Sequence, residues 1–294
     1  MKRAISLTGL AAVLVPALLA QAFGACAQRA AVAEVTGGVG GHGYAAAAAP
    51  QAAPRSDGFR WRGALAAGRV IEIKGIHGRV EAAPATGGEV EVVAEKRGRR
   101  SNPAEVRVEV VEHAEGVTIC AVYPTPDGSS RPNVCAPGEA GGMNVRNNDV
   151  SVDFTVRVPA GVRFYGRTVN GDVEAQNLTA DVDVSTVNGS INVSTAGLVS
   201  AKTVNGSITA AMGRADWTDG LEFQTVNGAI ELSLPASLSA EVEAETLNGD
   251  IQTDFPLTVT GRFSKRHLTG TIGGGGRELR LKTVNGSVHL RRAA

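Results

Sequence analysis

One six-residue phrase recurs along the second half of the chain and constrains its fold more than any other feature. The phrase is Thr-Val-Asn-Gly, then a small or acidic residue, then Ile or Val. Its copies lie at Thr168–Val173, Thr186–Ile191, Thr203–Ile208, Thr225–Ile230, Thr246–Ile251 and Thr283–Val288, with Leu247 replacing Val in one of them. Successive Asn residues are 18, 17, 22, 21 and 37 positions apart. A period near 20 residues indicates a repeat architecture, in which each unit buries its apolar face against its neighbours.

The residues that flank each copy alternate between apolar and polar side chains. Val182 and Val184 precede the copy at Thr186, with Asp183 between them, and Ile191 begins a second alternation. This pattern is typical of strands with one buried face. Each unit therefore predicts a strand, a sharp corner at Asn-Gly and a second strand. We expect Asn and Gly to supply the positive φ angles that a corner needs.

Two all-β folds fit this unit. In a single-domain β-solenoid each unit is one coil, and equivalent residues of successive coils stack about 4.8 Å apart. The repeated Asn residues would then form a structural ladder of side-chain amides bonded from coil to coil. The ladder residues are Asn170, Asn188, Asn205, Asn227, Asn248 and Asn285. In the alternative, an antiparallel β-hairpin meander, Asn-Gly is a type I′ hairpin loop. We favour the solenoid because a hairpin loop requires only Asn-Gly, whereas Thr and Val recur as well.

Two segments outside the six copies resemble the unit. Ile71–Val80 has the same alternation with His77 in the Asn position, and we interpret it as a first coil. Leu268–Ile272 places Thr269 in the Asn position, and we interpret it as a degraded copy.

The chain between the first coil and Thr168 alternates without the phrase. Val106–Val110 and Val150–Val158 fit both antiparallel strands and longer coils. The basic run Lys96–Arg100 is interpreted as a solvated turn between strands at Val90–Ala94 and Val106–Val110. The functional alternative for this run is contact with lipopolysaccharide, teichoic acid or phospholipid headgroups.

The first 27 residues predict a secretory signal, because a basic start precedes an apolar stretch and small residues. Cleavage fits after Ala22 or after Ala27. Phe23–Cys26 also resembles a bacterial lipobox, in which Cys26 carries a lipid, whereas the alternative is that Cys26 is removed with the signal. Residues 28–56 are rich in Ala, Gly and Pro and predict a flexible tether. The repeat domain then covers residues 57–294.

Composition narrows the set of partners. The formal net charge is zero, so no overall field attracts nucleic acid. Aromatic residues make up 4%, which disfavours stacking platforms for bases. We therefore expect no nucleic-acid partner, and membrane contact only through a lipid at Cys26.

Cys120 and Cys135 remain after removal of the signal. In an exported protein such a pair predicts a disulfide. A catalytic thiol is the alternative, and no His lies in a recognisable partner context for it.

The exported start, the tether and the repeated Thr-Val-Asn-Gly-Ser-Ile phrase together resemble the bacterial putative adhesin family, a domain of unknown function with Asn-Gly-rich β repeats. The resemblance covers Gly58–Leu290. It implies a β-solenoid fold and a cell-envelope location, and it brings no catalytic or binding residues with it. His77 and Thr269 depart from the Asn of the repeat.

The search for chemistry yields few candidates. The five His residues show no metal-ligand spacing, and we expect no metal and no cofactor. Carboxylates are frequent around the repeat: Asp172, Glu174, Asp181, Asp183, Glu222, Glu231, Glu241, Glu243, Glu245 and Asp250. On neighbouring coils they would form a cation site or a glycosidase-like pair. They do not recur at one position of the unit, so we favour a solubilising role on the polar face of the strands.

The leading hypothesis is a non-enzymatic exported protein of the periplasm, cell surface or extracellular space. Its rigid solenoid would act as an adhesin-like binding or scaffold module for an envelope polymer or protein. The alternative from another class is a polysaccharide lyase or hydrolase on a β-helix, which requires carboxylates converging in a groove. A third is a regulatory partner in envelope-stress signalling.

Overall fold

The computed structural model describes residues 55–218 and 220–293. The expected signal, Cys26 and residues 28–54 of the expected tether lie outside the described residues. The first strand begins at Arg55, so the last two residues assigned to the tether, Arg55 and Ser56, belong to a strand.

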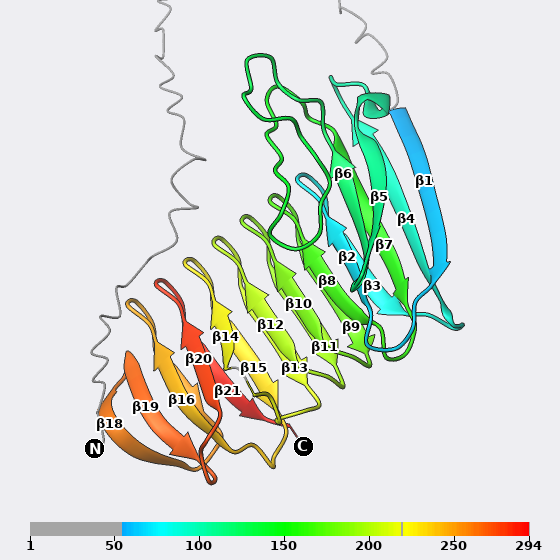
Figure 1. The fold of residues 1–294 in the computed structure, drawn as a ribbon. Coiled ribbons are helices and arrows are strands. Elements are labelled where there is room, and N and C mark those ends of the chain that lie inside the picture. The colour runs from blue at the N-terminus through cyan, green and yellow to red at the C-terminus, as the bar shows by residue number, and fades with distance from the viewer. Residues whose placement is uncertain (1–54, 219, 294) are drawn as a thin grey trace, which may run out of the picture. The chain divides into compact units, whose positions relative to one another are not determined.

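Two β-sheets face each other, and each repeat unit contributes one strand to each sheet (Figure 1). Within the described residues, sheet A has ten strands in the order β1 (Arg55–Ala64), β4 (Glu89–Gly98), β7 (Ser151–Val158), β3 (Val80–Pro84), β9 (Val173–Leu178), β11 (Ile191–Thr195), β13 (Ile208–Met212), β15 (Ile230–Leu234), β21 (Val288–Arg292) and β17 (Ile251–Thr253). Sheet B has eleven in the order β18 (Leu257–Ser264), β19 (His267–Ile272), β16 (Ala240–Glu245), β20 (Glu278–Lys282), β14 (Leu221–Gln224), β12 (Val199–Lys202), β10 (Val182–Ser185), β8 (Arg163–Arg167), β2 (Val70–Lys74), β6 (Gly116–Val122) and β5 (Arg107–His113).

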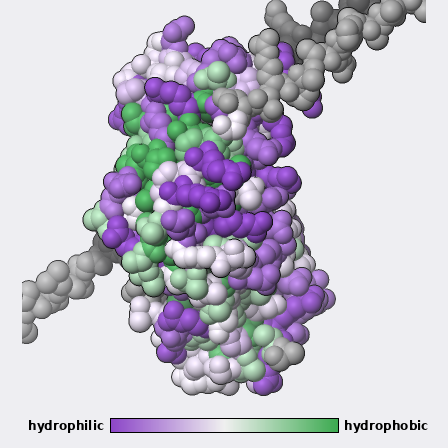
Figure 2. Space-filling view, turned by 90° about the vertical axis from the view of Figure 1, so that its right-hand side faces the viewer, coloured by the Kyte–Doolittle hydropathy of each residue, from purple (hydrophilic) through white to green (hydrophobic). Residues whose placement is uncertain are grey.

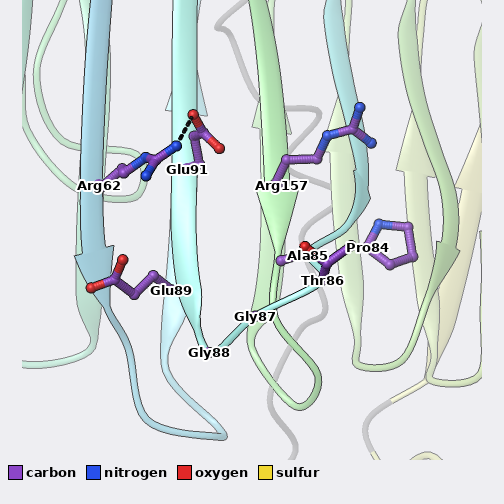
Figure 3. Close-up of a pocket in the computed structure, with 9 residues that line it drawn as sticks. All are labelled: Arg62, Pro84, Ala85, Thr86, Gly87, Gly88, Glu89, Glu91 and Arg157. Carbon is purple, nitrogen blue, oxygen red and sulfur yellow. Dashed lines mark hydrogen bonds and ion pairs between the residues drawn. The ribbon is translucent and has the colours of Figure 1, made fainter.

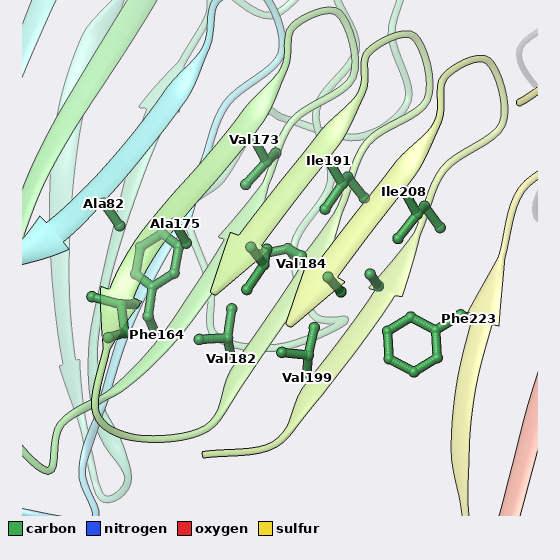
Figure 4. Packing of buried hydrophobic residues seen from close by; sticks show 14 of the residues in the cluster. Ala82, Phe164, Val173, Ala175, Val182, Val184, Ile191, Val199, Ile208 and Phe223 are labelled. Carbon is green, nitrogen blue, oxygen red and sulfur yellow. The ribbon is translucent and has the colours of Figure 1, made fainter. Parts of the chain in front are cut away.

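The apolar half of each alternating pattern fills the space between the sheets. Val184 from sheet B and Ile191 from sheet A are about 1% exposed, and Phe164 and Phe223 are fully buried (Figure 4). One continuous hydrophobic core therefore runs along the stack.

The units of the repeat pair in parallel and in register. Val182 pairs with Val199 in sheet B, and Ile191 pairs with Ile208 in sheet A. Each unit is thus one coil of a β-solenoid, and this fold is confirmed. The antiparallel hairpin meander is wrong for these units, because the two strands of one unit lie in different sheets.

The coils do not stack in chain order. Coil β20–β21 lies between coils β14–β15 and β16–β17. Coil β2–β3 lies between β6–β7 and β8–β9. Near each end of the stack, one coil therefore lies between two coils that are consecutive in the chain.

Of the two segments predicted to be irregular copies of the unit, one forms a coil and the other does not. His77 forms a parallel bridge with Asn170, so Ile71–Val80 is a coil as predicted. Thr269 is not in a corner, and the prediction of a degraded copy there is wrong. It lies in the middle of β19, antiparallel to β16 and opposite Glu243, because β19 pairs with β18 in a hairpin that ends sheet B.

Strands without the phrase cover the other end of the stack. Val106–Val110 lies mostly in β5, which is antiparallel to β6, whereas β7 is antiparallel to β4 and parallel to β3. The solvated turn expected at Lys96–Arg100 is wrong for its first half. Lys96 is buried in β4 and donates to the Val106 carbonyl at 3.2 Å, because β4 extends to Gly98.

Every Asn of the repeat lies in one row at the corners. The Nδ2 of Asn188 donates to the Oδ1 of Asn170 at 2.8 Å, and Asn205 donates to Asn188 at 2.7 Å. The same bond joins Asn227 to Asn205, Asn285 to Asn227 and Asn248 to Asn285, each at 2.7 Å. These side chains are exposed.

The Thr of each corner is buried beside this row. Thr203 is 5% exposed, and its Oγ1 donates to the Gly189 carbonyl of the neighbouring coil at 2.9 Å. The other Thr residues of the phrase make the equivalent bond. They satisfy carbonyls that a corner would otherwise leave unpaired.

The Gly of the phrase is required for a different reason from the one expected. Among the corner glycines only Gly78 and Gly286 have a positive φ, and none of the six Asn residues has one. The reason is close stacking, because a Cβ on Gly206 would lie 1.9 Å from the Gly189 carbonyl oxygen. Glycine at each corner therefore lets adjacent coils approach to hydrogen-bonding distance.

Candidate functional site

A cleft of about 530 Å³ opens on the outer face of sheet A, beside the loop that joins β3 to β4 (Figure 3). Its lining comes from four strands and this loop. The strand residues are Arg62, Pro84, Glu89, Glu91 and Arg157, and the loop residues are Ala85, Thr86, Gly87 and Gly88.

Strand register places the charged side chains in one row. Arg62 on β1 is paired with Glu91 on β4, and Glu91 is paired with Arg157 on β7. Ala83 on β3 is the next residue of the row. The small Ala83 side chain leaves space beside Arg157.

The arginines of this row differ in their partners. Glu91 accepts from Arg60 at 3.0 Å and from Arg62 at 2.9 Å. The hydrogen bond from Arg62 is the main reason that the pKa of Glu91 lies below its usual value. No hydrogen bond or ion pair joins Arg157 to the other described residues of the cleft, and its side chain leans toward β3 (Figure 3). The Arg157 guanidinium can therefore donate to a ligand.

A second hollow of about 270 Å³ shares Arg157 with the first. Its polar lining includes Glu81, Thr155, Glu174 and Gln176. Together the two hollows form a polar surface across β1, β4, β7, β3 and β9, with two arginines and four glutamates. Guanidinium groups donate and carboxylates accept, so this surface can hydrogen-bond a ligand that does both.

Sheet B carries a different polar arrangement. Residues 123–150, here named the strap, connect β6 to β7, and the predicted disulfide between Cys120 and Cys135 ties the strap to β6. Lys74 Nζ on β2 contacts three strap carbonyls, those of Ala136 at 2.6 Å, Ala140 at 3.2 Å and Gly138. Burial lowers the pKa of Lys74.

A carboxylate is buried beneath the strap. Glu72 is 2% exposed, and its Oε2 accepts from Thr118 Oγ1 at 2.8 Å and from the Gly138 amide at 3.0 Å. Its Oε1 lies 3.3 Å from Arg167 Nε. The bond from Gly138 and the Lys74 contacts attach the strap to sheet B. The protein's own polar groups therefore fill this arrangement, and it is not an open site.

The other sequence candidates stay separate. The carboxylates around the repeat are spread over both sheets, for example Glu174 in β9 and Glu243 in β16. The described residues contain no group of three or more His, Cys, Asp or Glu that could hold a metal ion. None of their helices is long and apolar enough to cross a membrane.

The cleft on sheet A was missed by sequence reasoning. Arg157 follows Ser151, Asp153 and Thr155 on the polar side of its strand, and this marks it as outward-facing. Nothing in the sequence shows that β4 lies next to β7, because 52 residues separate Gly98 from Ser151.

Residues 146–291 match the model of the Toastrack DUF4097 family. The repeat domain of this chain belongs to that family. The Toastrack match begins within the strap and includes Arg157, whereas β1 to β6 precede it.

Solved structures with similar folds are bacterial proteins. A putative cell adhesion protein from Clostridium sporogenes is 10% identical, covers 82% of this chain and 100% of its own, and has a TM-score of 0.43. A putative adhesin from Bacteroides fragilis is 13% identical, covers 81% and 97%, and has a TM-score of 0.33. One from Parabacteroides distasonis is 12% identical, covers 80% and 97%, and has a TM-score of 0.28. No curated protein matches the chain.

Proposed function

We propose that this Toastrack protein is an exported, non-enzymatic module of the cell envelope that binds an envelope polysaccharide on the outer face of sheet A. The observation that carries the proposal is the pair of hollows sharing Arg157. They place donors and acceptors on strands that backbone pairing holds in register.

The chemistry of the surface favours a hydroxyl-rich polymer. A sugar hydroxyl both donates and accepts, so it pairs with Arg157 and with Glu81, Glu174 or Gln176 alike. Arg60 and Arg62 pair with Glu91, and Arg79 pairs with Glu81, so the surface holds no excess of positive charge that would favour a strongly anionic polymer. Figure 2 shows hydrophilic and hydrophobic residues intermixed on one side of the molecule.

Export is supported by the disulfide. Such bonds persist in oxidising compartments and are rare in the bacterial cytosol. Attachment through a lipid at Cys26 is part of the proposal, and intact-mass measurement of the protein recovered from membranes would detect the added acyl chains.

The test is a binding assay with insoluble and soluble envelope polysaccharides, in which both retention of the protein and release of oligosaccharides are scored. We expect retention without release. The Arg157→Ala variant should bind about 10- to 100-fold more weakly, because a hydrogen bond to a charged group contributes about 1.5–3 kcal/mol.

The matched control is Arg291→Ala. Arg291 lies on the same face of sheet A, 3.0 Å from Glu231, and outside both hollows. Equal loss in the two variants would mean that only surface charge matters. Release of oligosaccharides would contradict the proposal and support a lyase or hydrolase.

A further inference from the structure

The Asn row is a hydrogen-bond chain with one direction. From Asn248 through Asn285, Asn227, Asn205 and Asn188 to Asn170, each Nδ2 donates to the Oδ1 of the next residue. Every amide therefore points the same way. Five steps of about 4.8 Å separate the two ends of the row by roughly 24 Å.

The row ends on a titratable residue. His77 occupies the Asn position of coil β2–β3, and Asn170 Nδ2 lies 3.0 Å from His77 Nδ1. An amide nitrogen only donates, so His77 Nδ1 accepts and the neutral ring carries its proton on Nε2. Burial lowers the pKa of His77, which agrees with a neutral ring.

Several charged or titratable groups surround His77. Tyr123, the first residue of the strap, packs edge-on against its ring, with centroids 5.8 Å apart. Arg100 and Asp149 line the same cleft as His77. Asp153 on β7 accepts from the Arg79 amide of the same corner at 3.0 Å. The Asp149 carboxylate accepts from the backbone amides of Arg100 and Ser101. The hydrogen bond of the His77 ring is made with Asn170.

We propose that protonation of His77 reverses the whole Asn row. Protonated Nδ1 is a donor, so Asn170 must turn its Oδ1 toward the ring. Its Nδ2 then faces the Nδ2 of Asn188, and two donors cannot bond. Turning Asn188 moves the same conflict to Asn205, and only reversal through to Asn248 restores every bond.

Two features of the row permit this reversal. All six Asn side chains are exposed, so an amide can turn without displacing the core. Both orientations contain the same number of hydrogen bonds, whereas a reversal that stops midway contains one fewer. Protonation of His77 therefore changes the orientation of the Asn248 side-chain amide at the far end of the row. This amide lies beside the exposed Leu247.

The test follows the side-chain amides by nuclear magnetic resonance. The full chain is labelled with 15N-asparagine, and the six Nδ2 resonances and the His77 ring are recorded from pH 7.5 to pH 4.5. We expect all six amides to titrate with the midpoint of His77, below pH 6.5. Titration of Asn170 alone, with Asn285 and Asn248 unchanged, would overturn the proposal.

Two variants locate the cause. His77→Asn completes the row with the residue of the other corners, and its amides should not titrate with this midpoint. Asn205→Ala interrupts the row, so Asn170 and Asn188 should titrate while Asn227, Asn285 and Asn248 should not. Titration beyond the interruption would show a general effect of pH, such as protonation of Asp172 or Asp250, and would also overturn the proposal.

Discussion

At the scale of single residues, the side chains of each corner differ in what they contribute. Thr is buried and satisfies a carbonyl of the next coil, whereas Asn makes its bonds in contact with water. Removing a partner from a buried polar group costs more than breaking an exposed hydrogen bond. The buried Thr hydrogen bonds are therefore expected to stabilise each corner more than the exposed hydrogen bonds between the Asn side chains do.

Replacing Thr203 with Val tests this difference. The variant keeps the shape of the side chain and leaves the Gly189 carbonyl without its Oγ1 donor. We expect a loss of about 1–3 kcal/mol in the free energy of unfolding, measured by urea denaturation. The control is Thr209→Val on the exposed side of β13, which should change stability by less than about 0.5 kcal/mol. Equal effects in the two variants would contradict the role of the buried hydroxyl.

His77 makes stability depend on pH in a predictable direction. Its pKa in the folded protein lies below the ordinary value of 6.5. Below pH 6.5 the unfolded chain binds a proton that the folded protein does not bind, so stability falls as the pH falls toward the folded pKa. Above pH 6.5 this contribution is fully present.

The measurement is the urea midpoint of the wild type and of His77→Asn between pH 7.5 and pH 5. The wild type should lose more stability than the variant over this interval, because Asn does not titrate. Other titrating groups contribute equally to both proteins and cancel in the difference. Parallel pH profiles would show that His77 titrates alike in the folded and unfolded states.

The corners also show what sequence can and cannot predict at this scale. The Asn row follows from the identical residue at the same position of each unit, because parallel coils stack equivalent positions. The role of Gly206 does not follow, since Asn-Gly is a common turn signal and suggested positive φ angles instead. Only the distance to the next coil shows that any side chain there would collide.

At the scale of elements, the strap is the main departure from regular coils. It replaces a short corner between β6 and β7, and it is held by Lys74, Glu72 and the disulfide. These contacts all fall within residues 135–140 of the strap, but they differ in the state on which they act. The disulfide restricts the unfolded chain, whereas Lys74 and Glu72 act only in the folded state.

We expect the free energy of unfolding of the double variant Cys120→Ser, Cys135→Ser to be about 3 kcal/mol lower than that of the oxidised wild type. The reason is that a disulfide closing a loop of this size lowers the entropy of the unfolded chain. Reduced wild type should match the variant. Because Lys74 and Glu72 remain, hydrogen exchange in β2 and β8 should stay close to that of the wild type under native conditions. Fast hydrogen exchange in β2 and β8 of the variant would mean that the disulfide alone holds the strap on sheet B.

The direction of strands was predictable only where the phrase marks a corner. Alternation alone does not distinguish a parallel from an antiparallel neighbour, so the sequence does not decide between the two for β5 and β7. The prediction of a corner at Thr269 is wrong for a related reason. A strand with Gly in it resembles a corner until its pairing with Glu243 on β16 is known.

At the scale of the whole molecule, the order of coils makes distant segments depend on each other. Coil β16–β17 and hairpin β18–β19 contact the rest of the stack through β20–β21, which lies between them and β14–β15. In a stacked repeat each coil is stabilised mainly by its nearest neighbours. The segment before β20 therefore needs the segment after it.

Deleting residues 277–294 tests this dependence. The deletion removes β20 and β21, so residues 240–272 lose their parallel partners, while the coils from β2 to β15 keep most of theirs. Limited proteolysis with mass spectrometry should show rapid cleavage within 240–272 and a resistant fragment from 55 to 234. If 240–272 stays protected, this coil docks directly on β14–β15 and the stacking order is not obligatory.

The central coils, from β8 to β15, all use the same corner and meet their neighbours through the same bonds. These central coils are consequently equivalent structural units. Duplicating one unit, such as residues 186–202, would lengthen the stack by about 4.8 Å while leaving both ends and the cleft unchanged. The number of units therefore sets the length of the stack.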